Sequence, residues 1–310
     1  MRRLQHTAAK LSLDTLTLEG GLFLPDQLEK AAQGRAPGQT EADYHLPRGI
    51  TLQDDYSRAF QIACASWQHF TATIESTPQA PEAAWSTTER FVSELLQHAF
   101  GYAALLPQRE LVIGTCTYPL TFTAGALPVL VAAHTLSLDE PEARFAVRGT
   151  GSRRKSAFQA MQELLNASPD HLWGMVCNGR TLRLLRDATT LTRPTFLEVD
   201  LAELLGAARY AEFAAAWRLL HASRGAGEPP STCHWERWRR DGIEEGTRVR
   251  EGLRRGVTAA LLALGNGFLG EPGNEALRQA LFSGALSAEG FFQQLLRLVY
   301  RCIFLFCLEE

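Results

Sequence analysis

The stretch LWGMVCNGRTLRLLRD (172–187) decides the fold, because it holds two strand-like runs on either side of a turn dipeptide. Residues 172–176 and 182–185 are mostly apolar, and Asn178 and Gly179 lie between them. An Asn-Gly pair tolerates positive φ at both central positions of a tight turn, so the pattern predicts a β-hairpin with a type I′ turn. Its apolar side chains are expected to pack a sheet.

The flanking sequence extends this hairpin into a mixed α and β pattern. Residues 127–133 form a short apolar run that predicts a buried strand, and 156–166 carry apolar residues at helical spacing. After the hairpin, 196–199 predict another strand, and Asp200 is a plausible N-cap for a helix over 201–205. Further strands are predicted at 11–18 and within 109–123, where Pro119 would join two of them. Helices are predicted at 25–32 and 52–74.

Beyond Tyr210 the pattern is wholly helical. Phe213, Trp217 and Leu220 form one apolar stripe. The segment SRGAGEPPST (223–232) predicts a linker by composition, and 234–265 predict one or two charged helices. We therefore expect three domains: an N-terminal strand and helix extension (1–85), an α/β domain (86–205) and a helical domain (206–310).

The segment FFQQLLRLVYRCIFLFCLEE (291–310) predicts a helix that is apolar on nearly every face, and protein must cover such a helix. We expect a further domain beyond Glu310 to cover it; the alternative is a helix folded back on this chain's own core. Its uninterrupted apolar run is far shorter than the about 20 residues that span a bilayer. With no apolar leader at the N-terminus, a cytoplasmic protein without a membrane span is expected.

The net charge of −3 leaves no global basic signal for nucleic acid, so any DNA contact must come from a local patch. The densest basic cluster is Arg148, Arg153, Arg154 and Lys155, in a Gly- and Ser-containing loop before the helix at 156–166. Such a loop can contact a DNA backbone through charge and backbone N–H groups. The alternative is an ordinary solvated loop.

The motifs of several catalytic classes are absent from the sequence. No CxxC pair, HExxH, phosphate-binding glycine loop or nucleophile elbow occurs, so no metal ligands and no catalytic residues are predicted. The tetrapeptide NPPY, typical of amino-methyltransferases, is also absent, as is a glycine-rich cofactor loop.

Six segments together resemble one family. The chain is similar, in the same order, to the N-terminal region of large bacterial restriction-modification methylase subunits. These are the type IIG-like N6-adenine DNA methyltransferases of restriction systems and of phage-defence loci such as DISARM and BREX. The segments are LEGGLFLPDQLEKAAQG (18–34), 163–187, LTRPTFLEVDLAELL (191–205), YAEFAAAWRLLHASR (210–224), 235–269 and 291–310.

The resemblance implies a layout. The first part would be a sheet related to the PD-(D/E)xK nucleases, and a helical connector would lead toward a methyltransferase domain absent from this chain. S-adenosyl-L-methionine (SAM) would then bind that absent domain and not this chain alone. The expected partners are DNA, the missing domain and other defence-system subunits.

A PD-(D/E)xK nuclease needs an Asp on one strand and a Glu and a Lys two residues apart on the next, to hold Mg²⁺ and activate water. Where that second strand is expected, this chain has LPVLVAAH (127–134). Available carboxylates are Glu94, Glu110, Asp139 and Glu142, but none fits the pattern. A degenerate nuclease fold is therefore expected, with Mg²⁺ only if it is active. The alternatives are a stand-alone DNA-binding module and an active Mg²⁺-dependent endonuclease.

Overall fold

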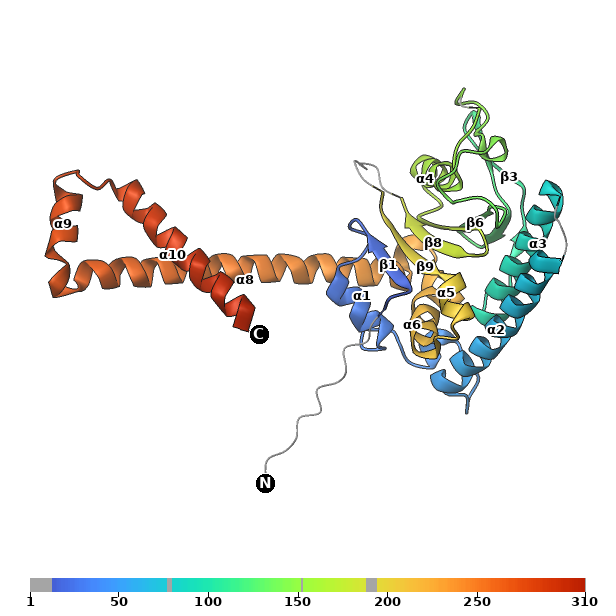
Figure 1. Cartoon of the computed structure of the whole chain (residues 1–310), viewed down its shortest axis with the longest axis horizontal. Helices are drawn as coiled ribbons and strands as arrows, with labels where there is room; N and C mark the ends of the chain where they lie inside the picture. Colours follow the sequence, from blue (N-terminus) through green and yellow to red (C-terminus); the bar gives the residue numbers. More distant parts are fainter. Residues whose placement is uncertain (1–12, 77–79, 152, 188–193, 310) are drawn as a thin grey trace. The chain divides into compact units, whose positions relative to one another are not determined.

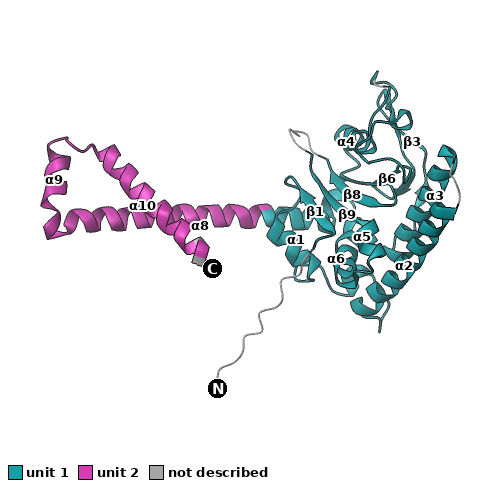
Figure 2. Ribbon diagram, in the orientation of Figure 1, with its two compact units in different colours: residues 1–242 teal, residues 243–310 magenta. Residues whose placement is uncertain are grey.

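The computed structural model describes residues 13–76, 80–151, 153–187 and 194–309. Contacts divide the chain into two compact units, Met1–Gly242 and Ile243–Glu310 (Figure 2). The domain boundaries predicted at 85/86 and 205/206 stay predictions, because contact density does not measure which segments fold on their own.

The first unit is built on a mixed sheet of seven strands in the order β1-β9-β8-β7-β6-β5-β2. Strands β1, β9, β8 and β6 of this sheet are labelled in Figure 1. Strands β6 and β7 are parallel, with Val129 opposite Met175, and the other neighbouring pairs are antiparallel. Parallel neighbours need a crossover connection, and helix α4 (Ala157–Ala167) lies in that connection. The expected mixed α and β fold followed by a helical region is confirmed at this level. The strands are β1 (Leu16–Glu19), β2 (Leu106–Pro107), β5 (Phe122–Ala124), β6 (Leu127–Val131), β7 (Trp173–Cys177), β8 (Thr181–Arg186) and β9 (Phe196–Asp200).

The hairpin predicted from 172–187 is confirmed as β7 and β8, with Cys177 opposite Leu182. The predicted type I′ turn is wrong. Within the fully described turn 178–181, Gly179 has a φ of 79°, whereas Asn178 does not have positive φ. The Asn178 Oδ1 atom instead accepts hydrogen bonds from the N–H groups of Arg180 at 3.0 Å and Thr181 at 2.8 Å. These side-chain bonds close the turn while Asn178 keeps an ordinary backbone conformation.

Both faces of the sheet are covered, which is why β6 reads as a continuous apolar run. All five β6 residues are buried. Val129 and Val131 belong to the larger core and Leu130 to a second core on the opposite face, as the period of two dictates. The larger core includes residues of α1 (Pro25–Ala32), α2 (Leu52–Ser76), α3 (Pro81–Glu94), α5 (Leu201–Gly206) and α6 (Tyr210–Leu220).

Helix α4 covers the second face closely because β7 carries a glycine there. A Cβ atom on Gly174 would lie 2.6 Å from the Met161 Sδ atom of α4. Met161 and Leu164 are fully buried in the second core. The predicted helix at 156–166 is thus confirmed, with its N-cap at Ser156.

The strand pattern predicted over 109–123 forms a separate two-stranded sheet and the start of β5. Strands β3 (Glu110–Ile113) and β4 (Cys116–Pro119) pair with each other, so the chain turns at residues 114–115. The prediction that Pro119 joins two strands is therefore imprecise, because Pro119 is the last residue of β4. The strand predicted at 11–18 appears as β1, and its first two residues lie outside the described part.

The prediction of a linker at 223–232 is wrong. This segment forms α7 (Ala222–Gly225) and a short 3-10 helix (Pro230–Thr232) within the first unit, and the Arg224 side chain is fully buried. Gly225 marks a tight contact, since its Cβ atom would lie 2.5 Å from the Trp235 ring. Glycine here permits close packing, so its presence in this segment does not mark a linker.

The second unit consists of helices. Helix α8 (His234–Gly270) is one continuous helix that starts in the first unit, and α9 (Glu275–Phe282) and α10 (Ala288–Glu309) follow. Helix α10 contacts α8 where Leu295 meets Gly265, and Leu295 and Val299 are buried. Most large apolar side chains of α10 stay exposed, namely Phe292, Leu298, Tyr300, Phe304, Leu305, Phe306 and Leu308.

Among the described residues, no helix combines the length and the apolar character that crossing a bilayer requires.

Candidate nucleic-acid interface

The four cations predicted to contact DNA lie in the segment between β6 and α4, and three of them are paired with carboxylates of this chain. The Arg148 guanidinium lies 2.5 Å from a Glu110 carboxylate oxygen, and that of Arg154 lies 3.9 Å from Glu142. The Lys155 ammonium contacts Glu163 of α4. Arg153 is exposed. The cluster therefore carries less net positive charge than the sequence suggests.

The pairs differ in how accessible their cations are. The side chains of Arg148 and Arg154 are 65% and 63% exposed, and ion pairs this exposed exchange partners easily. The Lys155 side chain is 12% exposed, and its backbone pairs with that of Glu142. Arg148, Arg153 and Arg154 can therefore meet an external phosphate, whereas Lys155 holds the start of α4 in place.

Arg148 also lines a cleft of about 420 Å³ whose wall includes two further arginines, Arg109 and Arg144. The cleft lies where β5 begins and β6 ends, since Thr121, Leu130 and Val131 line it. The other lining residues are Trp85, Glu89, Glu110, Thr117, Pro119, Leu120, Ala143, Phe145 and Ala146.

Arg109 is held by α3. Its guanidinium donates two hydrogen bonds to the Glu89 carboxylate, at 2.8 and 3.0 Å. These bonds raise the pKa of Arg109 above its usual value. The Arg109 side chain is 67% exposed, so one side of the guanidinium remains open to solvent.

The guanidinium of Arg144 stacks on an aromatic ring. It lies 4.6 Å from the centre of the Trp85 ring, and Phe145 meets the same ring edge-on at 5.5 Å. Trp85 is 9% exposed, so this stacking covers a nearly buried ring. Arg144 also contacts the carboxylate of Glu82.

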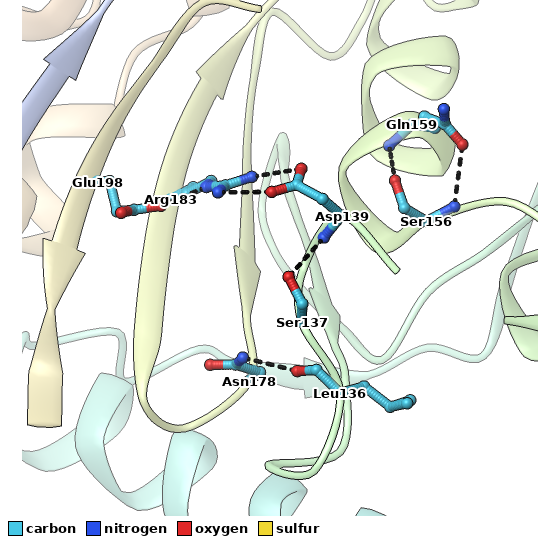
Figure 3. Close-up of polar contacts among 8 residues, drawn as sticks. All are labelled: Leu136, Ser137, Asp139, Ser156, Gln159, Asn178, Arg183 and Glu198. Carbon is cyan, nitrogen blue, oxygen red and sulfur yellow. Dashed lines mark hydrogen bonds and ion pairs between the residues drawn. The ribbon is translucent and has the colours of Figure 1, made fainter. Parts of the chain in front are cut away.

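The segment that carries Arg144 and Arg148 is anchored at both ends (Figure 3). Near its start, the Asn178 Nδ2 atom donates to the Leu136 carbonyl at 2.8 Å, and Arg183 of β8 donates to both Asp139 oxygens at 2.7 and 2.8 Å. At its end, Ser156 and Gln159 form a capping box, with both hydrogen bonds at 3.1 Å.

The middle of this segment is tied to β4. Arg148 and Thr117 exchange backbone hydrogen bonds of 3.0 and 2.9 Å. Gly149 follows with a φ of 97°, and its Cβ atom would lie 2.6 Å from the Thr115 carbonyl oxygen. A larger residue at 149 would push Arg148 away from the β3–β4 turn, so glycine positions this arginine.

No group of His, Cys, Asp and Glu side chains within the described ranges is arranged to hold a metal ion. Three of the carboxylates available for nuclease chemistry are paired with arginines: Asp139 with Arg183, Glu110 with Arg148, and Glu142 with Arg154. Glu94 is the last residue of α3. Strand β6 is where the Glu and Lys of a nuclease would be expected, and the β6 residues that line the cleft are Leu130 and Val131.

The sequence did not single out Arg109 and Arg144. Arg144 lies four residues before Arg148, so a wider search for basic residues could have included it. Arg109 is far earlier in the chain and reaches the cleft through the fold of the β3–β4 hairpin against α3. Comparison with protein-family models, with curated proteins and with solved structures finds no match for this chain.

Proposed function

We propose that this chain is the N-terminal module of a SAM-dependent N6-adenine DNA methyltransferase from a bacterial restriction or phage-defence system. Its role is to position DNA or the partner domains and subunits of that system. The methyl transfer belongs to a separate domain, which flips the target adenine out of the duplex and binds SAM. The family assignment rests on the resemblance of six segments, and the exposed side chains of Arg148, Arg153 and Arg154 are the observation that supports contact with DNA.

A degenerate PD-(D/E)xK-like sheet fits this role. Strands β5 and β6 are antiparallel neighbours, and β6 is followed by α4 and its parallel neighbour β7. Metal-assisted cleavage needs carboxylates on these strands. β6 (LPVLV) and β5 (FTA) carry none. The sheet in our proposal therefore holds DNA without cutting it.

The DNA-contacting role is tested by affinity against salt. We expect the full chain to bind a short duplex at low salt, with an affinity that falls steeply as salt rises. Arg153→Ala combined with Arg154→Ala should reduce the slope of log affinity against log salt by about 2, because each lost phosphate contact removes about 0.9. Flat or undetectable binding at low salt would contradict this role.

The separate location of the methyltransferase site is tested by calorimetric titration of SAM into the chain. We expect no saturable heat, because no glycine-rich cofactor loop or NPPY is present. Stoichiometric SAM binding would place the cofactor site in this chain and overturn the proposed layout.

A stand-alone DNA-binding module is the first alternative, and the DNA downstream of codon 310 distinguishes the two. An open reading frame that carries NPPY supports the methyltransferase module. A stop codon at that point favours the stand-alone module.

An active nuclease is the second alternative, and a plasmid assay with Mg²⁺ or Mn²⁺ tests it. We expect supercoiled DNA to persist with both metals, since the strands that would bind them lack carboxylates. Nicking that EDTA abolishes would establish the nuclease instead.

A further inference from the structure

We propose that the cleft lined by Arg109, Arg144 and Arg148 is a phosphate-binding site that carboxylates of the same chain occupy until a ligand displaces them. The ligand class is phosphate, carried either by a nucleic-acid strand or by a free nucleotide. The choice of DNA as the source rests on the function proposed above, whereas the phosphate chemistry does not.

Arg109 lies just before β3, whereas Arg144 and Arg148 lie in the segment between β6 and α4, and all three line one cleft. Each is bound by a carboxylate, and two of these carboxylates, Glu89 and Glu110, also line the cleft. A planar guanidinium donates paired hydrogen bonds to phosphate oxygens in the same geometry as to a carboxylate. The carboxylates therefore stand where phosphate oxygens can bind.

Of the two carboxylates that line the cleft, Glu110 is the easier to displace from its partner, Arg148. The Arg148 side chain is 65% exposed and that of Glu110 is 49% exposed, so both can be re-solvated as the pair opens. Glu89 is 21% exposed and binds Arg109 through both oxygens, so this pair is the more firmly held. We therefore expect a phosphate to displace Glu110 first.

The surroundings favour an anion in the cleft. Its lining has three arginines against two glutamates, and its volume of about 420 Å³ is within the range of about 300–1,000 Å³ that ligand sites occupy. The buried Trp85, Phe145 and Leu130 form part of its wall. Apolar walls lower the local dielectric and strengthen the attraction between a phosphate and the arginines.

The contrary explanation is that the ion pairs only hold the β3–β4 hairpin and residues 143–148 against α3. The two explanations differ in what neutralising Glu110 does. If Glu110 competes with a ligand, Glu110→Gln raises the affinity for phosphate. If Glu110 only holds the structure together, the substitution loosens Arg148 and lowers that affinity or leaves it unchanged.

The test uses the full chain with two probes, inorganic pyrophosphate in calorimetry and a short fluorescein-labelled duplex in anisotropy. Arg109→Gln and Arg148→Gln should each weaken binding about tenfold, as expected for the loss of a charge-assisted pair of hydrogen bonds. Glu110→Gln should tighten binding about threefold. The matched control is the pair Arg58 and Asp55 on α2, 2.8 Å apart and not part of the cleft lining, where Arg58→Gln and Asp55→Asn should leave the binding of both probes unchanged.

The two probes separate this inference from the proposed function. Cleft-dependent binding of pyrophosphate without DNA binding supports a phosphate site for a free nucleotide and contradicts the DNA role. If DNA binding depends on Arg153 and Arg154 but is unchanged in the cleft variants, the proposed phosphate-binding site in the cleft is contradicted and the DNA role stands. Failure of both probes to bind at low salt would contradict the proposed phosphate-binding site. So would a Glu110→Gln variant that does not bind more tightly. A gain of affinity cannot come from misfolding, so Glu110→Gln decides even if an arginine variant folds poorly.

Discussion

Arg224 is a buried cation whose guanidinium is hydrogen-bonded to backbone carbonyl groups. Its guanidinium donates to the carbonyl oxygens of Gly38 and Asp43, the latter at 2.5 Å, and to the Ser223 hydroxyl at 2.9 Å. It also stacks on the Tyr44 ring, 3.7 Å from the ring centre. Burial lowers the pKa of Arg224 from its usual value. This one side chain ties α7 to the loop before α2.

Replacing Arg224 should therefore be costly. Arg224→Met removes the donors that the half-buried carbonyl oxygens of Gly38 and Asp43 accept from, and each carbonyl group left without a partner costs about 1–3 kcal/mol. We expect the free energy of unfolding to fall by about 3 kcal/mol in urea denaturation. Arg58→Met, at a side chain that is 58% exposed, should change it by less than about 0.5 kcal/mol. A similar small change for both variants would contradict the role assigned to Arg224.

Two histidines near Arg224 are held neutral. Burial, and then the charge of Arg224, lower the pKa values of His221 and His234 from 6.5 to about 4. His221 is 8% exposed, and its Nδ1 atom lies 2.8 Å from the Ser223 hydroxyl. The unfolded chain binds protons at these histidines below pH 6.5, while the folded chain does not until about pH 4.

Stability should consequently depend on pH. It is fully present above pH 6.5 and decreases as the pH falls from 6.5 toward 4, because protons there favour the unfolded state. His221 contributes up to about 3 kcal/mol to this loss. Urea denaturation across this range measures it, and His221→Asn should flatten the curve. An unchanged pH dependence in His221→Asn would show that other groups cause the loss.

At the scale of elements, the β7–β8 turn and the segment after β6 depend on one side chain. Asn178 closes the turn through its Oδ1 atom and fastens Leu136 through its Nδ2 atom. Asn178→Ala should lower the free energy of unfolding by about 2 kcal/mol and speed hydrogen exchange within 132–139. Asn266→Ala, at an exposed position of α8, is the control. Unaltered hydrogen exchange within 132–139 would contradict the role of Asn178 in holding this segment.

The elements that local patterns define were predictable from sequence. The two strands around Asn178–Gly179, the apolar run of β6 and the Ser156 cap of α4 are all set by neighbouring residues. The turn type was not predictable, because the Asn178 side chain also reaches Leu136, far away in sequence. The prediction of a linker at 223–232 was wrong for a similar reason, because Arg224 in this segment donates hydrogen bonds to Gly38 and Asp43, which lie far away in sequence.

The candidate site was predictable only where it is contiguous in sequence. The run Arg148 to Lys155 is visible because its cations are close along the chain. The cleft is not visible, because α3, the β3–β4 hairpin and the segment after β6 each supply part of its wall. The positive charge of this run is partly offset by carboxylates outside it, since Glu110 pairs with Arg148 and Glu163 pairs with Lys155.

At the scale of the whole chain, the exposed apolar side chains of α10 should dominate solution behaviour. Phe304 and Phe306 are 65% and 67% exposed. Surfaces of this kind bind hydrophobic dyes and promote association. Phe304→Gln with Phe306→Gln should lower the fluorescence of the dye ANS and reduce association in light scattering. The midpoint of unfolding should change little, because neither side chain is buried.

The matched control for this prediction is Val299→Gln, on the same helix. Val299 is 5% exposed, so its substitution should loosen the helical unit and raise the dye signal instead. Equal effects of the exposed and buried substitutions would show that α10 is covered in solution.

The packing of β6 constrains how this sheet can evolve. Leu130 is 2% exposed, and a carboxylate in its place would be desolvated before any metal had bound, at a cost of several kcal/mol. A whole domain has only about 5–15 kcal/mol of stability. Exchanges among Val, Leu and Ile cost far less. A mutational path toward metal binding on this strand would need a carboxylate, room for it and a second ligand on β5 at nearly the same time, so selection for folding alone disfavours carboxylates on β6.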